Sequence, residues 1–384
     1  MEAAFHRRFI LQLALGLIAL LGLAVLLNRA ANPYCLFATD WLPAKSKPET
    51  FTHLRLVKAM QVRHVKPQAV ILGSSRAETG LSPEHAGWKA RPAYNLGLSD
   101  ARLYEIKSYF EFACSQAQVK QAMLLLDFTA FLPGGRNSPD FSEERLQGFS
   151  AEDYLLGLCS WDATSGSLNT LLGRQGEKSY LANGSRDVSV ENARVKAKGG
   201  ALRAFLAYEK RFMTAGTAPT HLDEEAQQVF RDILAVARRH SVDLRLAVAP
   251  VHARYLEMLD RCGQAALFEE WKKWITAEVE KEAVDSKQSA FPLLDFSGYN
   301  EFTTEPVPEK GLATYYLESS HFTQALGDKL LDRLFSDEAP ATPGAFGFRM
   351  SSAQMEAHLT AIREARERYH RERAEELASL PQPQ

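Results

Sequence analysis

"VILGSSRAETG", residues 70–80, places an apolar run directly before a turn of small polar residues. A strand that is buried on both faces of a parallel sheet reads as such a continuous apolar run. Gly73 ends the run, and Ser74 and Ser75 follow it. The segment therefore predicts a buried strand that turns sharply into a helix. Ser75 is then either a nucleophile at the strand end or a serine that only caps the helix.

Apolar runs and amphipathic segments alternate along much of the remaining chain. Further strands are expected at residues 93–97, 121–128, 243–250 and 291–297. Helices are expected at residues 51–65, 101–117, 222–240 and 252–279, and at the end of residues 318–335. Strands that alternate with helices predict an α/β fold in which helices cover both faces of a parallel sheet.

The N-terminal segment 9–27 is apolar apart from Gln12 and carries no charge. A helix that crosses a bilayer needs about 20 such residues, whereas a cleaved secretory signal has an apolar stretch of about 7–15. Arg7 and Arg8 precede the run, which favours a cytoplasmic N-terminus. We therefore expect a single-pass protein of the bacterial inner membrane with most of the chain in the periplasm. Cleavage near residues 28–32 is the alternative.

These features divide the chain into five parts. They are a cytoplasmic tail (1–8), a transmembrane helix (9–27), a stalk with a lead-in helix (28–66), the main domain (67–336), and a linker with a charged C-terminal helix (337–384). Residues of about 132–220 are irregular and are expected to form an insertion over the top of the sheet. The C-terminal helix has only a narrow apolar stripe, so we expect it to pack weakly on the domain or on a partner.

Composition and motifs exclude several classes of function. The formal net charge of -2 gives no basic surface for nucleic acid. The chain has no G-x-x-x-x-G-K-[ST] or G-x-G-x-x-G motif and no C-x-x-C spacing among its cysteines. We therefore expect no nucleotide or other cofactor, no metal centre and no nucleic-acid partner. Disulfide pairing stays open, because four cysteines allow three connectivities.

Polar side chains follow each expected strand, at the edge where ligands bind in doubly wound sheets. In strand order they are Ser74 and Ser75, then Gly97, Ser99 and Asp100, then Asp127 and Thr129, then His252, and last Glu318 and His321. A serine hydroxyl needs a base within hydrogen-bond reach and a third group that orients the base. His321 is the best candidate base, and Glu318 lies three residues earlier, within reach of its other ring nitrogen.

Four short blocks carry a resemblance to a known family. They are GSSR at residues 73–76, YNLGLSDAR at 94–102, LLLDFTAF at 124–131 and ESSHF at 318–322. Together they resemble the SGNH/GDSL hydrolase superfamily over roughly residues 66–335, with the insertion unmatched. More narrowly, the chain looks like membrane-anchored extracytoplasmic members, including relatives of the D-alanyl transfer protein of teichoic acid synthesis and of the alginate O-acetylation proteins. The resemblance implies a flavodoxin-like, three-layer parallel sheet.

By position, the resemblance implies a triad in which Ser75 is the nucleophile, His321 the base and Glu318 the orienting carboxylate. It also implies an oxyanion hole or pocket that involves Gly97, Asp100 and Thr129. Three residues depart from the usual pattern: Glu318 replaces an Asp, Asp100 replaces a Gly, and Thr129 replaces an Asn donor.

Some of these polar residues also have a simpler structural interpretation. Asp100 is expected to cap the helix that follows it. Arg76 is expected to be solvated rather than to clamp an anionic group. Asp127 is expected to be buried, with loop amides as its hydrogen-bond donors. His252 is expected to be structural, with a place in the pocket as the alternative.

The resemblance implies a periplasmic esterase or O-acyltransferase that acts on an exported polysaccharide or envelope glycan. A membrane-bound acyltransferase is the expected partner if the reaction is acyl transfer. The three departures favour a different interpretation, a non-catalytic SGNH-fold module of a polysaccharide modification or export machine. A third and weaker alternative is a lipid esterase, which a membrane anchor permits.

Overall fold

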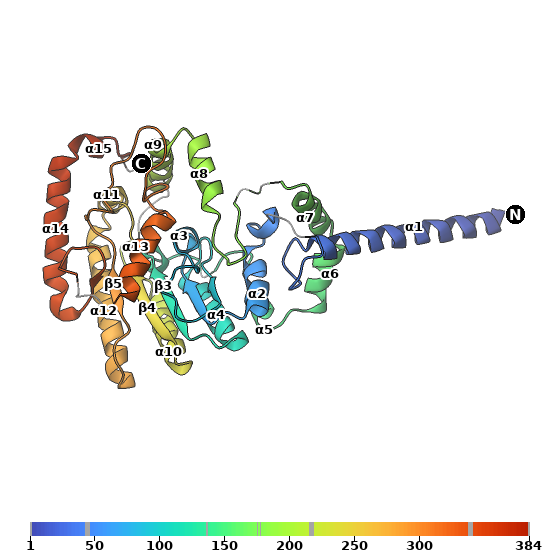
Figure 1. Ribbon diagram of the computed structural model, residues 1–384, viewed down its shortest axis with the longest axis horizontal. Coiled ribbons are helices and arrows are strands. Elements are labelled where there is room, and N and C mark those ends of the chain that lie inside the picture. The colour runs from blue at the N-terminus through green and yellow to red at the C-terminus, as the bar shows by residue number, and fades with distance from the viewer. Residues whose placement is uncertain are drawn as a thin grey trace. The chain divides into compact units, whose positions relative to one another are not determined.

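The computed structural model describes residues 2–42, 47–135, 137–174, 176, 178–214, 219–336 and 341–382. The chain forms two compact units. Unit 1 comprises residues 1–64 and 142–181, and unit 2 comprises residues 65–141 and 182–384. Unit 1 contains the long N-terminal helix, and unit 2 contains a six-stranded sheet with helices around it (Figure 1).

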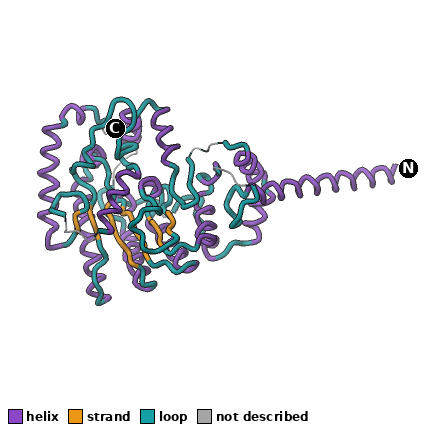
Figure 2. Tube along the Cα trace, in the orientation of Figure 1, coloured by secondary structure: helices purple, strands orange, loops and turns teal. Residues whose placement is uncertain are grey.

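The sheet of unit 2 has the strand order β2-β1-β3-β4-β5-β6. The strands are β1 (Ala69–Leu72), β2 (Ala93–Asn95), β3 (Gln121–Leu126), β4 (Asp243–Val248), β5 (Leu293–Asp295) and β6 (Phe348–Arg349). β1 to β5 are parallel, and β6 pairs antiparallel with β5. Figure 2 shows the strands gathered together with helices around them. The order 2-1-3-4-5 is a common doubly wound order, and its switch point lies between β1 and β3. The predicted α/β fold with a parallel sheet is confirmed, whereas β6 was not predicted.

The helices follow the predicted alternation, with one exception. Unit 1 contains α1 (Glu2–Ala31), α2 (Leu54–Val65), α5 (Glu143–Gln147), α6 (Ala151–Cys159) and α7 (Trp161–Leu171). Unit 2 contains α3 (Ser75–Gly80), α4 (Leu103–Gln116), α8 (Val188–Ala197), α9 (Ala201–Met213), α10 (Glu224–Arg239), α11 (Ala253–Arg261), α12 (Ala265–Ser286), α13 (Gln324–Phe335), α14 (Met355–Glu372) and α15 (Ala374–Ala378). The single helix predicted at 252–279 is wrong, because Gly263 adopts a φ of 71° and separates α11 from α12.

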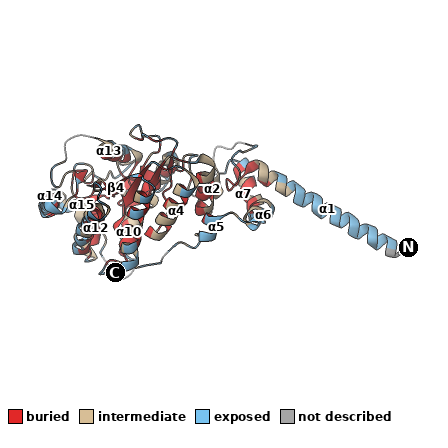
Figure 3. Ribbon diagram, turned by 90° about the horizontal axis from the view of Figure 1, so that it is seen from below, coloured by how far each residue is buried: buried red, intermediate tan, exposed pale blue. Residues whose placement is uncertain are grey.

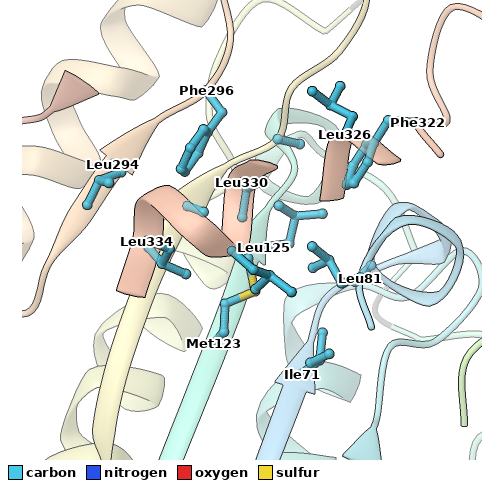
Figure 4. Packing of buried hydrophobic residues seen from close by; sticks show 14 of the residues in the cluster. Ile71, Leu81, Met123, Leu125, Leu294, Phe296, Phe322, Leu326, Leu330 and Leu334 are labelled. Carbon is cyan, nitrogen blue, oxygen red and sulfur yellow. The ribbon is translucent and has the colours of Figure 1, made fainter. Parts of the chain in front are cut away.

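An apolar core joins α13 to the sheet (Figure 4). Leu326, Leu330 and Leu334 recur every four residues, so they lie on one stripe of the helix, and all three are buried. They belong to the same cluster as Met123 and Leu125 of β3. Each such leucine stabilises the fold by about 1.5–3 kcal/mol relative to an exposed one.

Two glycines allow α3 and α13 to touch. A Cβ added at Gly327 would lie 1.6 Å from the carbonyl oxygen of Gly80. A Cβ added at Gly80 would lie 2.0 Å from the ring of Phe322. A larger residue fits at neither position without moving a helix. The contact brings the helix that begins at Ser75 against the helix that follows the ESSHF block.

Unit 1 corrects the predicted stalk and insertion. Residues 28–64 fold together with residues 142–181, which belong to this unit rather than to the sheet domain. Asn28 is buried and donates a hydrogen bond to the carbonyl of Leu158 in α6 (2.9 Å). Leu36 and Val57 share an apolar cluster with Ala163 of α7. The remainder of the predicted insertion, with α8 and α9, belongs to unit 2.

The C-terminal segment is a firmly packed part of unit 2, so the prediction of a weakly packed tail helix is wrong. β6 extends the sheet, and α14 packs through charged side chains as well as apolar ones. Arg366 binds Glu257 on α11 through two hydrogen bonds of 2.9 Å. Leu359 and His358 are buried. Residues on α11 and β5 thus form hydrogen bonds with polar side chains of α14 that the sequence pattern predicts to be solvated.

Asp295, the last residue of β5, is the centre of a buried charged cluster. Its carboxylate lies 2.7 Å from Lys272 Nζ on α12 and accepts a hydrogen bond from His358 Nε2 (2.9 Å) on α14. Burial alone would raise the pKa of Asp295, but Lys272 and His358 outweigh it and hold the pKa below its ordinary value. The cluster attaches α12 and α14 to the carboxyl end of β5.

Lys272→Met is expected to lower the free energy of unfolding by about 3–5 kcal/mol, because it leaves the Asp295 carboxylate buried without its cation. The adjacent Lys273→Met is the matched control. Lys273 is partly exposed and pairs with an exposed Glu356, so its loss should cost less than about 1 kcal/mol. Urea unfolding of the full chain in detergent, followed by tryptophan fluorescence, measures both. Equal effects of the two substitutions would contradict the role of the cluster.

Candidate active site

Ser75 is placed at the end of β1 by a turn that requires glycine. Gly73 has a φ of 145°, and a Cβ there would lie 2.9 Å from the Cβ of Ala77 and 3.1 Å from the carbonyl oxygen of Leu125. The chain therefore turns from β1 directly into α3, whose first residue is Ser75. This position is the carboxyl edge of the sheet, at the switch point between β1 and β3.

The two adjacent serines differ in their partners. Ser74 is the N-cap of α3, where its Oγ accepts from the Arg76 N–H (3.3 Å) and donates to the Asp127 carboxylate. The Oγ of Ser75 instead lies 2.8 Å from His321 Nε2. The capping role belongs to Ser74, and the hydroxyl in contact with an imidazole belongs to Ser75.

Glu318 orients the ring of His321. Its Oε1 accepts from His321 Nδ1 and from the His321 backbone N–H (2.9 Å), and its Oε2 accepts from the Ser320 N–H (3.1 Å). With Nδ1–H directed at a carboxylate, Nε2 is left to accept the proton of Ser75. The three predicted triad residues therefore lie in the hydrogen-bonded order of a hydroxyl, an imidazole and a carboxylate.

The loop that carries His321 is bound to the core of unit 2. The Oγ of Ser319 donates to Glu209 on α9 (2.6 Å), and the Ser319 carbonyl accepts from the His252 N–H (3.1 Å). Glu209 is itself held by Arg254 through two hydrogen bonds of 2.7 and 2.6 Å. Because these side chains are buried, the position of His321 is set by the core.

Arg76 is buried beside the serines, so the expectation of a solvated arginine is wrong. Its guanidinium pairs with Asp127, and its Nε donates to the carbonyl and the hydroxyl of Ser320 (3.1 and 3.0 Å). Burial acts to lower the pKa of Arg76, but Asp127 outweighs it and the pKa lies above its ordinary value. Asp127 is buried as predicted, but its partners are the side chains of Ser74 and Arg76 rather than loop amides.

A cavity of about 450 Å³ opens over the triad. Besides Ser75 and His321, its lining includes Asp100, Arg102, Thr129, Tyr208, Arg211 and Phe212. The last three come from α9, within the predicted insertion, where the sequence singled out no individual residue. Burial raises the pKa of Tyr208, so its phenol is neutral at physiological pH. A second hollow of about 540 Å³, at the start of α10, contains none of the triad residues.

The predicted oxyanion or pocket residues separate into two groups. Asp100 and Thr129 line the cavity, whereas Gly97 does not. Gly97 is packed against α3, where a Cβ would lie 2.9 Å from the backbone nitrogen of Glu78. Asp100 does not cap the next helix as expected, because the N-cap of α4 is Arg102. Asp100 has a φ of 57°, a conformation that glycine adopts easily and that Asp tolerates.

His252 is structural and does not line the cavity. Its Nδ1 accepts from the Arg254 N–H (3.2 Å), and its Nε2–H donates to the Glu305 carbonyl (2.8 Å). Burial lowers the pKa of His252 to about 3, so the ring is neutral at physiological pH.

The site consists of protein side chains that suit nucleophilic chemistry. Within the described ranges, no group of three or more His, Cys, Asp and Glu residues could hold a metal ion. All four cysteines are among the described residues, and each is a free thiol. No protein-family model matches the chain, and no curated protein matches it. A serine hydroxyl with an oriented imidazole base can attack an acyl carbonyl carbon.

Asp127→Asn is expected to destabilise the protein by about 3–5 kcal/mol, because it leaves the Arg76 guanidinium buried without a counter-charge. Asp100→Asn is the matched control, since Asp100 also follows a strand but is exposed. Asn tolerates its left-handed φ, so the change should stay within about 0.5 kcal/mol. Urea unfolding of the full chain measures the free energy of unfolding of both variants. A small effect of Asp127→Asn would show that the pair does not hold the site together.

Proposed function

We propose that the chain is a serine esterase or O-acyltransferase of the SGNH type. The observation that carries the proposal is the 2.8 Å contact between Ser75 Oγ and His321 Nε2, with Glu318 on the other ring nitrogen. The serine follows the first strand and the histidine comes after the fifth, which agrees with the block order of that superfamily. The open cavity gives an acyl ester access to the hydroxyl.

The reaction would proceed through a covalent acyl intermediate. Ser75 Oγ attacks the carbonyl carbon while its proton passes to His321 Nε2, and Glu318 stabilises the imidazolium through Nδ1–H. The tetrahedral intermediate collapses when His321 returns the proton to the leaving alcohol, which leaves an ester on Ser75. Water or a second hydroxyl then attacks this ester, gives its proton to His321, and releases Ser75 with its proton restored.

The oxyanion donors would be backbone groups near the nucleophile. The N–H of Ser75 lies in the first turn of α3, where a helix provides no acceptor for it. Asp100 lines the same cavity, and its left-handed backbone occupies the position of the usual glycine. The hydroxyl of Thr129 is a further candidate donor. Each donor of this kind raises the reaction rate by a factor of about 10²–10³.

The proposed substrate is an acylated or acceptor glycan outside the cytoplasm. Tyr208 and Phe212 supply aromatic surfaces and Arg211 a polar group to the cavity, which suits a sugar better than a purely apolar chain. The segment Ala4–Ala31 of α1 is long and apolar enough to cross a membrane, and an 18-residue window within it has a mean hydropathy of 2.7. A periplasmic location next to the inner membrane would place the site near exported polysaccharide. A membrane-bound acyltransferase would supply the acyl group for transfer.

The full chain in detergent is expected to react with a fluorophosphonate probe, with fluoride lost from phosphorus and the Ser75 proton taken by His321. Ser75→Ala should abolish labelling, whereas Ser74→Ala should still be labelled, because the Ser74 hydroxyl is bound to Asp127. In-gel fluorescence and mass spectrometry of the labelled peptide measure this. Labelling that survives Ser75→Ala removes Ser75 from the mechanism. A folded wild type that never reacts favours the non-catalytic module.

Glu318→Gln is expected to slow this labelling by up to about 10⁴-fold, because an amide cannot hold the reactive tautomer of His321 as a carboxylate does. Glu318→Asp keeps the charge on a shorter side chain and should give an intermediate rate. Pseudo-first-order labelling rates at one probe concentration compare the three proteins. If Glu318→Gln reacts as fast as the wild type, Glu318 does not orient the base.

A further inference from the structure

Unit 1 presents large apolar side chains on the outer surfaces of α6 and α7. On α6, Leu155 and Leu156 are 60% and 57% exposed. On α7 and its C-cap, Trp161, Leu168 and Leu172 are 81%, 45% and 66% exposed. α6 and α7 also pack against each other. Apolar patches exposed on a protein mark a contact with another protein or with a membrane.

The exposed residues of α7 lie on one face of the helix. Trp161, Leu168 and Leu172 are separated by seven and four residues, and at 100° per residue they fall within about 40° of one another. The opposite side is buried and consists of small or polar residues: Ala163, Gly166, Ser167 and Thr170. The helix therefore directs its large apolar side chains outward and its small ones into the unit. This is the reverse of the pattern in a surface helix of a soluble protein, whose apolar face packs on the core.

This surface is fixed to the end of α1. The Asn28 side chain donates to the Leu158 carbonyl of α6 (2.9 Å) and to Thr164 Oγ1 of α7 (3.0 Å), and it accepts from Ser167 Oγ (2.7 Å). Asn28 follows directly on Leu27, the last residue of the apolar run. The two helices thus attach where the apolar span ends.

The side chains of α1 are exposed over residues 4–23, and those at 24, 25 and 27 are half-buried near the point of attachment (Figure 3). Leu23 and Leu26 are 64% and 58% exposed, and a helix that is apolar all round is typical of a protein core or a membrane span. Arg29 comes next and stacks over the rings of Phe37 and Trp41, each 4.2 Å from its guanidinium carbon. Trp side chains are enriched at the boundary between a bilayer and water, and Arg side chains near the end of a span reach that boundary.

We propose that Leu155, Leu156, Trp161, Leu168, Leu172 and Trp41 form an interfacial surface that inserts into the outer-facing leaflet where α1 leaves it. The occupant is lipid, because α6 and α7 both pack against α1, the helix that the proposed function places in the membrane. A surface attached one turn from the end of a span of about 20 residues lies at the depth of the headgroup and acyl boundary. The inference rests on the membrane anchor of the proposed function and not on its acyl chemistry.

Tryptophan quenching tests the surface in the full chain. The protein is reconstituted into phosphatidylcholine vesicles with brominated acyl chains, which quench only tryptophans in contact with lipid. Part of the wild-type emission should be quenched, and Trp41→Phe with Trp161→Phe should remove that part. The remaining tryptophans include Trp88 and Trp271, which are buried in unit 2. Iodide added to the water phase should quench Trp161 little, although its side chain is 81% exposed.

The other results overturn the proposal in distinguishable ways. If iodide rather than bromolipid quenches Trp161, the surface faces water; if neither does, another protein copy covers it. Leu21→Trp in the double Trp→Phe variant reports on the anchor, since Leu21 lies in the middle of α1 and is 50% exposed. Quenching of this residue by bromolipid without quenching of Trp161 leaves the anchor intact and rejects the surface. Absence of quenching at residue 21 rejects both.

Discussion

The buried ion pair of Arg76 and Asp127 is the constraint on which the candidate site depends. Asp127 follows β3, Arg76 follows Ser75 after β1, and the same guanidinium binds the backbone of Ser320. A buried pair of this kind adds little net stability but is costly to break, so it fixes where its partners meet. Ser75 is the chain neighbour of Arg76, and His321 is the chain neighbour of Ser320, to which the Arg76 guanidinium is bound. Their contact across 246 positions of sequence follows from it.

Features that depend on near neighbours in the chain were predictable from the sequence. Gly73 marks the turn after β1, and the apolar run before it marks a strand that is buried on both faces. The rule that ligands gather at the carboxyl ends of parallel strands selected Ser75, Glu318 and His321. The burial of Arg76 was not predictable, because its partner lies 51 residues away and polarity does not reveal where a side chain points.

The same limit explains the errors at both ends of the chain. The sequence placed Asn28 in a stalk, but its side chain donates a hydrogen bond to the carbonyl of Leu158, 130 positions later in the chain. Arg366 looks solvated in a helix rich in Arg and Glu, but Glu257 of α11 binds it. In each case a polar residue forms hydrogen bonds with a distant segment of the chain. Hydrophobic periodicity predicts local secondary structure and does not predict such long-range pairs. The α9 residues Tyr208, Arg211 and Phe212 were missed because no sequence motif marks a side chain that lines a cavity.

At Glu318 the resemblance to SGNH hydrolases implies an Asp, and the surrounding loop accounts for the longer side chain. Its carboxylate folds back over its own turn, with one oxygen on the ring and backbone of His321 and the other on the Ser320 N–H. The backbone of this loop is held in place, because Ser319 is bound to Glu209 and Ser320 is bound to Arg76. An Asp here, one methylene shorter, would have to reach the ring from a fixed backbone. The longer side chain is therefore matched to the anchoring of the loop, and its presence argues for a site built around His321 rather than against one.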